Sequence, residues 1–149
     1  LRPIFDKFDV PSIDKVVEKK LKGDDIIYFG NFDFEREEIE FLDIQKIPRF
    51  TKQDIRQNND VVLDTLKNFL SLHDHILINF DIDVFDSTLV SATGIPNNNG
   101  LLENHVFPQL HIIKSHKSKT IVLSELNPEK AGTAQSTDIA KSIILELLG

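Results

Sequence analysis

Two apolar periods alternate along this chain, and their alternation limits the folds that it can adopt. The runs Ile26–Phe29, Ile76–Phe80 and Thr120–Leu123 are largely apolar over consecutive positions, as strands covered on both faces are. The segments between and after these runs place apolar residues at the spacing of one face of a helix. Strands that alternate with such helices predict parallel β-α-β units, and therefore an α/β fold with three layers (α-β-α) and a mainly parallel sheet.

Start and end signals divide the rest of the chain into helices and one further strand. The short apolar piece Ile39–Ile44 is interpreted as a strand that Pro48 ends. Pro108 is expected in the first turn of a helix, where its missing N–H is tolerated. The expected helices run from a Ser12 cap to about Gly23, from Lys52 to about Leu72, from an Asn104 cap to about Ser115, and from a Thr137 cap to Leu147.

Composition excludes several classes of protein. The chain has 149 residues, which suits one domain, and its formal net charge of −7 disfavours nucleic acid as a partner. No apolar run approaches the roughly 20 residues of a membrane span, so we expect no membrane segment. The absence of cysteine removes disulfides and thiolate metal sites and fits a reducing compartment, so we expect a cytoplasmic protein. Because the chain starts with Leu1 rather than Met, we expect it to be part of a longer protein.

Acidic residues follow two of the expected strands, where ligands bind in parallel α/β sheets. Asp81 and Asp83 come close after Phe80, and their i, i+2 spacing in extended chain places both side chains on one face, with about 6.5 to 7 Å between the two residues at the backbone. Two unpaired anions at the end of a buried strand need a positive partner, and a hard divalent cation is the natural candidate. The alternative is that these aspartates cap the following turn or pair with surface lysines.

The residues around this pair carry a resemblance to a known family. The stretch Asn79–Asp86, followed by Ala92–Pro96 and Gly100-Leu101, is similar to the second metal-binding signature of the ureohydrolases, which include arginase, agmatinase and formimidoylglutamase. The similarity continues through Glu125–Pro128 and Thr133-Ala134 into the last expected helix. It extends over roughly half of the chain. The resemblance therefore implies that residues 1–149 are the C-terminal part of a single ureohydrolase-like α/β domain.

The resemblance also implies a chemistry. Ureohydrolases use two Mn²⁺ ions and the hydroxide that bridges them to attack the carbon of a guanidinium or formimino group and break a C–N bond. By position, Asp81 and Asp83 would be metal ligands, Glu125 would lie near the cationic group of a small-molecule amidine substrate, and Asp86 would fix the turn. The family's remaining metal ligands, a histidine and an Asp-x-His-x-Asp motif, and its catalytic residues would then lie upstream of residue 1.

Some positions depart from the pattern and bear on the substrate. Ile95 stands where arginases and agmatinases carry a threonine, which favours the formimidoylglutamase branch or a divergent arginase-like branch. His73 and His75 look like ligands, but they lie at the amino end of a strand, about 17 Å or more from Asp81, so we expect loop roles for them.

Two further hypotheses stay open beside the enzyme. The chain could be a divergent, catalytically inactive relative that acts as a structural or regulatory subunit, or another two-metal hydrolase that reached Asp-x-Asp independently. Oligomers are common in the resembled family, so a homo-oligomer is also compatible with the sequence.

Overall fold

The structure is a computed structural model of the chain, and it describes residues 21–30, 34–57 and 59–149. The chain divides into two compact units: Leu1–Tyr28 with Asp33–Arg49, and Phe29–Phe32 with Phe50–Gly149. Most of the helix that we expected from a Ser12 cap lies outside the described residues; its expected end, Gly23, begins a short 3₁₀ turn, η1 (Gly23–Asp25).

The first unit contains a helix where we predicted a strand. The chain runs from β1 (Tyr28–Phe29) to β2 (Arg49–Phe50) through α2 (Arg36–Ile44), so the strand expected over Ile39–Ile44 is wrong. The Glu38 carboxylate accepts the Glu35 N–H at 3.1 Å and so caps the helix start, and acidic residues in the first turn suit the helix dipole. Leu42 is buried while Ile44 is 66% exposed, which is the burial pattern of one helix face.

The second unit holds the larger core and a parallel strand pair. Its elements are α3 (Lys52–Gln57), α4 (Asn59–Ser71), β3 (Ile76–Asp81), η2 (Ile82–Val84), α5 (Glu103–Lys114), β4 (Lys119–Ser124) and α6 (Thr133–Leu148). β3 and β4 pair in parallel, from Ile76 opposite Lys119 to Asp81 opposite Ser124. The predicted strands Ile76–Phe80 and Thr120–Leu123 are therefore confirmed, as is the α/β class with a parallel sheet.

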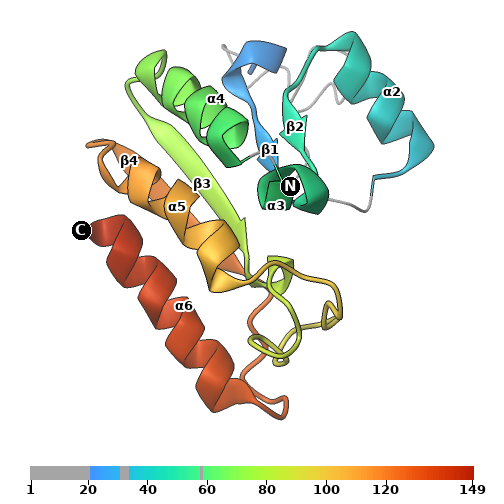
Figure 1. Ribbon diagram of the computed structural model, residues 1–149, viewed down its shortest axis with the longest axis vertical. Coiled ribbons are helices and arrows are strands. Elements are labelled where there is room, and N and C mark those ends of the chain that lie inside the picture. Colours follow the sequence, from blue (N-terminus) through green and yellow to red (C-terminus); the bar gives the residue numbers. More distant parts are fainter. Residues whose placement is uncertain (1–20, 31–33, 58) are drawn as a thin grey trace, which may run out of the picture. The chain divides into compact units, whose positions relative to one another are not determined.

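Helices cover one face of this strand pair. α4, α5 and α6 lie side by side along β3 and β4 (Figure 1). Ile78 and Phe80 of β3 pack into the core that these helices share. On the opposite face Leu77 is 67% exposed and Val122 is 40% exposed. Among the described residues, the second face of the strand pair is therefore partly exposed.

The helix boundaries differ from the expected ones for local reasons. The expected helix from Lys52 to Leu72 is two helices, since α3 ends at Gln57 and α4 begins at Asn59. α5 begins at Glu103, because the His105 ring accepts the Leu102 N–H at 3.1 Å, so Asn104 is not the cap and Pro108 lies beyond the first turn. α6 begins at Thr133 after Gly132, whose φ of 82° only glycine adopts readily, which places Thr137 inside the helix.

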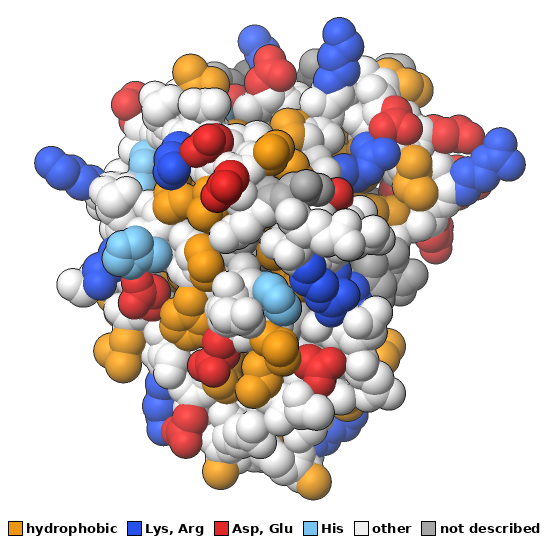
Figure 2. All heavy atoms as spheres, in the orientation of Figure 1, with side chains coloured by type: hydrophobic (Ala, Val, Ile, Leu, Met, Phe, Trp, Pro, Cys, Tyr) orange, Lys and Arg blue, Asp and Glu red, His pale blue; other side chains and the backbone are white. Residues whose placement is uncertain are grey.

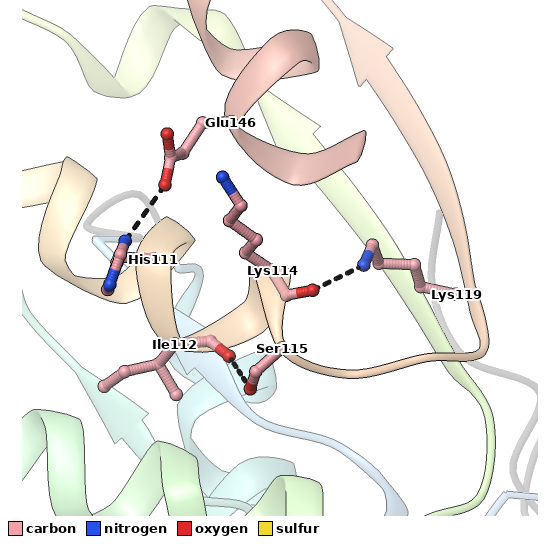
Figure 3. Close-up of polar contacts among 6 residues, drawn as sticks. All are labelled: His111, Ile112, Lys114, Ser115, Lys119 and Glu146. Atoms are coloured by element: carbon pink, nitrogen blue, oxygen red, sulfur yellow. Dashed lines mark hydrogen bonds and ion pairs between the residues drawn. The ribbon is translucent and has the colours of Figure 1, made fainter. Parts of the chain in front are cut away.

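The end of α5 is held by side chains that connect it to its neighbours (Figure 3). The Ser115 hydroxyl donates to the Ile112 carbonyl at 2.7 Å, and the Lys119 ammonium donates to the Lys114 carbonyl at 2.9 Å. His111 of α5 lies 3.2 Å from Glu146 of α6. These contacts satisfy carbonyls that a helix end leaves without internal partners and fix where β4 starts. None of the described helices is both long and apolar enough to cross a bilayer.

Candidate functional site

Three carboxylates gather where β3 and β4 end, and we call Asp81, Asp83 and Glu125 the acidic cluster. Asp81 is the last residue of β3, Asp83 lies in the 3₁₀ turn η2, and Glu125 directly follows β4. Because the two strands are parallel and in register, their carboxyl ends lie at the same edge. The Asp81 carboxylate also accepts the Asp83 N–H at 3.3 Å, so Asp81 caps the turn as the simpler interpretation expected.

The charges of the acidic cluster act on one another. The pKa of Asp83 is raised from 3.8 to about 6, first because burial disfavours its charged form and then because the carboxylates of Asp81 and Glu125 repel it. The Lys52 ammonium acts in the opposite direction. The three acids that the sequence placed at two strand ends therefore share one electrostatic environment, and that environment has an excess of negative charge.

The backbone of Glu125 adopts a conformation that non-glycine residues rarely take. Its φ is 66°, in the left-handed region, which costs of order 1 kcal/mol or more and persists where the surroundings enforce it. Its carboxylate lies against Gly94, since a Cβ at that position would be 3.3 Å from Oε2. Just beyond it, the Asn127 N–H donates to the Ala92 carbonyl at 2.8 Å. Glu125 is thereby held over the loop that follows the aspartates.

That loop is folded back on itself by paired backbone groups. Phe85 forms a bridge with Leu101, and Asp86 forms one with Asn97. The bridges require Gly100, because a Cβ there would lie 2.1 Å from the carbonyl carbon of Phe85. Asp86 accepts hydrogen bonds from the N–H and the hydroxyl of Thr88, which lower its pKa and give it the turn-fixing role that we expected.

The sequence did not reveal the cations and the amide that hold this loop. The Lys52 ammonium donates to Asn97 Oδ1 at 3.2 Å, and Asn97 Nδ2 donates to the Asp83 carbonyl at 3.2 Å. The Arg56 guanidinium donates to the Gly100 carbonyl at 2.7 Å. Both cations belong to α3, more than forty residues away in sequence. Their only sequence signal was an amphipathic helix pattern, which does not predict the segment that the polar face of the helix contacts.

The histidines take structural roles, as expected. His73 Nδ1 lies 2.7 Å from the Phe69 carbonyl, and its ring stacks on Phe69 with centroids 4.3 Å apart. The His75 ring lies between two hydroxyls, 2.8 Å from that of Ser118 and 3.1 Å from that of Thr120. Both residues lie at the amino end of β3, at the opposite end of the strand from Asp81.

The donor chemistry of the acidic cluster fits a hard divalent cation in part. Carboxylate oxygens are the ligands that Mg²⁺, Ca²⁺ and Mn²⁺ prefer, and an excess of negative charge favours any cation that neutralises it. Within residues 21–30, 34–57 and 59–149, however, no group of three or more His, Asp or Glu side chains is arranged to hold a metal ion. The pair Asp81 and Asp83 therefore supplies part of a coordination shell.

A shallow groove lies apart from this edge. It has a volume of about 700 Å³ and runs between α4, α5 and α6, where hydrophobic side chains are interspersed with acidic and basic ones (Figure 2). The acidic cluster does not contribute to its lining, which consists of Leu63, Lys67, Asn104, Phe107, Pro108, His111, Ile112 and Glu146.

Comparison with known proteins identifies the fold. The sequence profile of the Arginase family matches residues 11–149. The arginase of Helicobacter pylori is 25% identical to the chain, with a TM-score of 0.73 over 87% of this chain and 44% of the arginase. The Entamoeba histolytica arginase, solved in complex with L-ornithine, is 22% identical, with a TM-score of 0.78 over 91% of this chain and 46% of its own.

Formimidoylglutamases share the fold as well. The formiminoglutamase of Trypanosoma cruzi, crystallised with Mn²⁺, is 15% identical, with a TM-score of 0.73 over 92% of this chain and 48% of its own. The chain thus spans less than half the length of each of these three proteins. No curated protein sequence matches the chain.

Proposed function

We propose, from the premise that this chain belongs to the arginase family, that it forms part of a ureohydrolase, an enzyme that hydrolyses a C–N bond of a linear amidine. The observation that carries the proposal is the convergence of Asp81, Asp83 and Glu125 where two adjacent parallel strands end. Acids on two strands can act on one ligand from two sides, which acids on a single turn cannot.

Asp81 and Asp83 would hold manganese in this proposal. Their hard oxygens suit the ion, and the family resemblance implies metal ligands at both positions. When bound, manganese supplies a Lewis acid and lowers the pKa of water. The pair provides at most four donor atoms, whereas two such ions need about ten to twelve, so the remaining ligands would come from parts of the fold that this chain does not supply.

Glu125 would bind the substrate rather than the metal. Its backbone adopts the left-handed conformation, and its carboxylate lies against Gly94. An anion at this edge suits the positively charged amidine group and stabilises charge that grows there during the reaction. Its exposure leaves it accessible to a small molecule.

Ile95 bears on which amidine is cleaved. Its side chain is 82% exposed and apolar, so it cannot donate a hydrogen bond to a substrate. Arginases and agmatinases carry a threonine at this position of the motif. We therefore propose a formimidoylglutamate-like substrate, or a guanidino compound bound in a divergent way, rather than arginine bound as in arginases.

A second role is a structural or regulatory subunit without activity. The incomplete ligand set among the described residues favours it. Both roles make the isolated 149-residue chain inactive, so the test belongs in the protein that carries this chain together with the rest of the fold.

Asp81→Asn and Asp83→Asn in that protein should each abolish Mn²⁺-dependent hydrolysis and lower bound manganese, because an amide keeps the shape but loses the charge. Asp138→Asn is the matched control, since Asp138 is an exposed helix residue paired with Lys141. Near-normal turnover in either site variant would contradict the ligand assignment. Absence of activity and of bound manganese in the unmodified protein would instead favour the subunit role.

A further inference from the structure

Among the residues that the structure describes, Lys52 is a cation that acts on the acidic cluster. It is the first residue of α3, it is half-buried, and its ammonium donates to Asn97 Oδ1 at 3.2 Å. The same Asn97 amide donates through Nδ2 to the Asp83 carbonyl at 3.2 Å. The Asn97 side chain therefore joins the Lys52 ammonium to the backbone of Asp83.

The position of Asn97 is itself fixed. Its carbonyl accepts the Ser87 N–H at 2.8 Å, and its side-chain oxygen also accepts the Asn99 N–H at 3.2 Å. The Lys52 ammonium is thus directed by a folded loop and not by a flexible surface contact. This arrangement differs from an exposed ion pair, whose contribution is screened by solvent.

The charged groups around Lys52 also connect it with the acidic cluster. Burial and the neighbouring Arg56 guanidinium lower the pKa of Lys52, whereas the carboxylates of Asp83 and Asp86 raise it. The Lys52 ammonium in turn lowers the pKa of Asp83. The carboxylates that act on this ammonium include that of Asp83, so the ammonium offsets part of the negative charge of the acidic cluster without any bound ion.

We propose that Lys52 is a built-in counter-ion of the acidic cluster, and that its ammonium competes with a divalent cation for Asp83 and weakens the binding of that cation. The inference rests on the proposed function, because it assumes that Asp81 and Asp83 bind a metal. It adds a residue from α3, outside the strand ends, that adjusts metal affinity. With Lys52 in place, the cluster is partly neutralised before the ion arrives; with the ion bound, the ammonium must move away or be repelled.

The test replaces Lys52 with methionine, which keeps a long unbranched side chain but has no charge and no oxygen that could become a ligand. The 149-residue chain is heated in EDTA and then with increasing Mn²⁺, and unfolding is followed by circular dichroism. Lys52→Met should lower the melting temperature in EDTA, because the carboxylates lose their counter-ion. It should also lower the Mn²⁺ concentration at half-maximal stabilisation by about tenfold, the order of magnitude that removing the repulsion between a single and a double positive charge gives in water at short range.

Two controls separate charge from packing. Lys52→Arg keeps the charge and should respond to Mn²⁺ as the unmodified chain does. Lys141→Met removes an exposed lysine from α6 and should leave the Mn²⁺ response unchanged.

The outcomes distinguish this inference from the proposed function. If the unmodified chain is stabilised by Mn²⁺ and Lys52→Met requires the same or more Mn²⁺, the competition is refuted while the metal site stands. If Mn²⁺ stabilises neither chain, the competition is refuted, whereas the metal site of the proposed function is decided separately by the Asp81→Asn and Asp83→Asn variants of the protein that supplies the remaining ligands.

Discussion

Replacing Gly100 with alanine tests whether the loop beside the acidic cluster is built as the structure shows. An alanine Cβ would lie 2.1 Å from the Phe85 carbonyl carbon, 2.2 Å from the Asp86 nitrogen and 2.3 Å from the Phe85 carbonyl oxygen. These contacts are all with backbone, which cannot rotate away as a side chain can. The two segments would have to separate by about 1 Å to reach ordinary van der Waals contact.

That separation breaks identified hydrogen bonds. The Asp86 N–H donates to the Leu101 carbonyl at 2.9 Å, and the Leu101 N–H donates to the Val84 carbonyl at 2.8 Å. Losing both costs about 1–3 kcal/mol, and overpacking adds about 1–3 kcal/mol. We therefore expect Gly100→Ala to lower the free energy of unfolding by about 2–6 kcal/mol, or the melting temperature by roughly 5–20 °C.

Urea unfolding followed by circular dichroism measures this change. Gly94→Ala is the matched control, because a Cβ there meets only the end of the Glu125 side chain, at 3.3 Å. That side chain can shift, so the control should stay within about 1 kcal/mol of the unmodified chain. A Gly100→Ala chain as stable as the Gly94→Ala chain would show that the two segments do not approach each other as described.

Three further outcomes can be checked. Glu125→Gln in the protein with a complete fold should lower kcat/KM by about ten- to a hundredfold, because one charge-assisted hydrogen bond to the substrate is lost. Its manganese content should stay the same, and loss of manganese would show that Glu125 is a metal ligand instead. Phe85→Ala should lower the free energy of unfolding in urea by about 3–5 kcal/mol, because the ring is fully buried. Leu72 is 79% exposed, so Leu72→Ala should lower it by less than about 0.5 kcal/mol, and equal effects would contradict the core assignment. Because the pKa of Asp83 is raised from 3.8 to about 6, the folded chain binds its proton more tightly than the unfolded chain. Metal-free stability relative to Asp83→Asn should therefore fall as pH rises between those values, and a constant difference would refute the shift.

The strand pair and the acids at its end followed from the sequence alone. The largely apolar runs Ile76–Phe80 and Thr120–Leu123 are short and alternate with helical patterns, which favours strands of a sheet over helices. The placement of Asp81, Asp83 and Glu125 then follows from the strand ends, because parallel strands bring their carboxyl ends to one edge. The roles of these acids in metal and substrate binding remain predictions.

Tertiary structure decided what local patterns leave open. The apolar residues of Ile39–Ile44 suit a strand or a helix, and the packing of Leu42 with Ile47 in the core of the first unit favours the helix. Which face of β3 would be covered depended on where the helices packed, so the exposure of Leu77 was invisible in the sequence. The meeting of Lys52, Asn97 and Asp83 depended on contacts between distant segments. Periodicity records how each residue relates to its near neighbours, whereas the charge environment of the acidic cluster is set by residues that only the folded chain brings together.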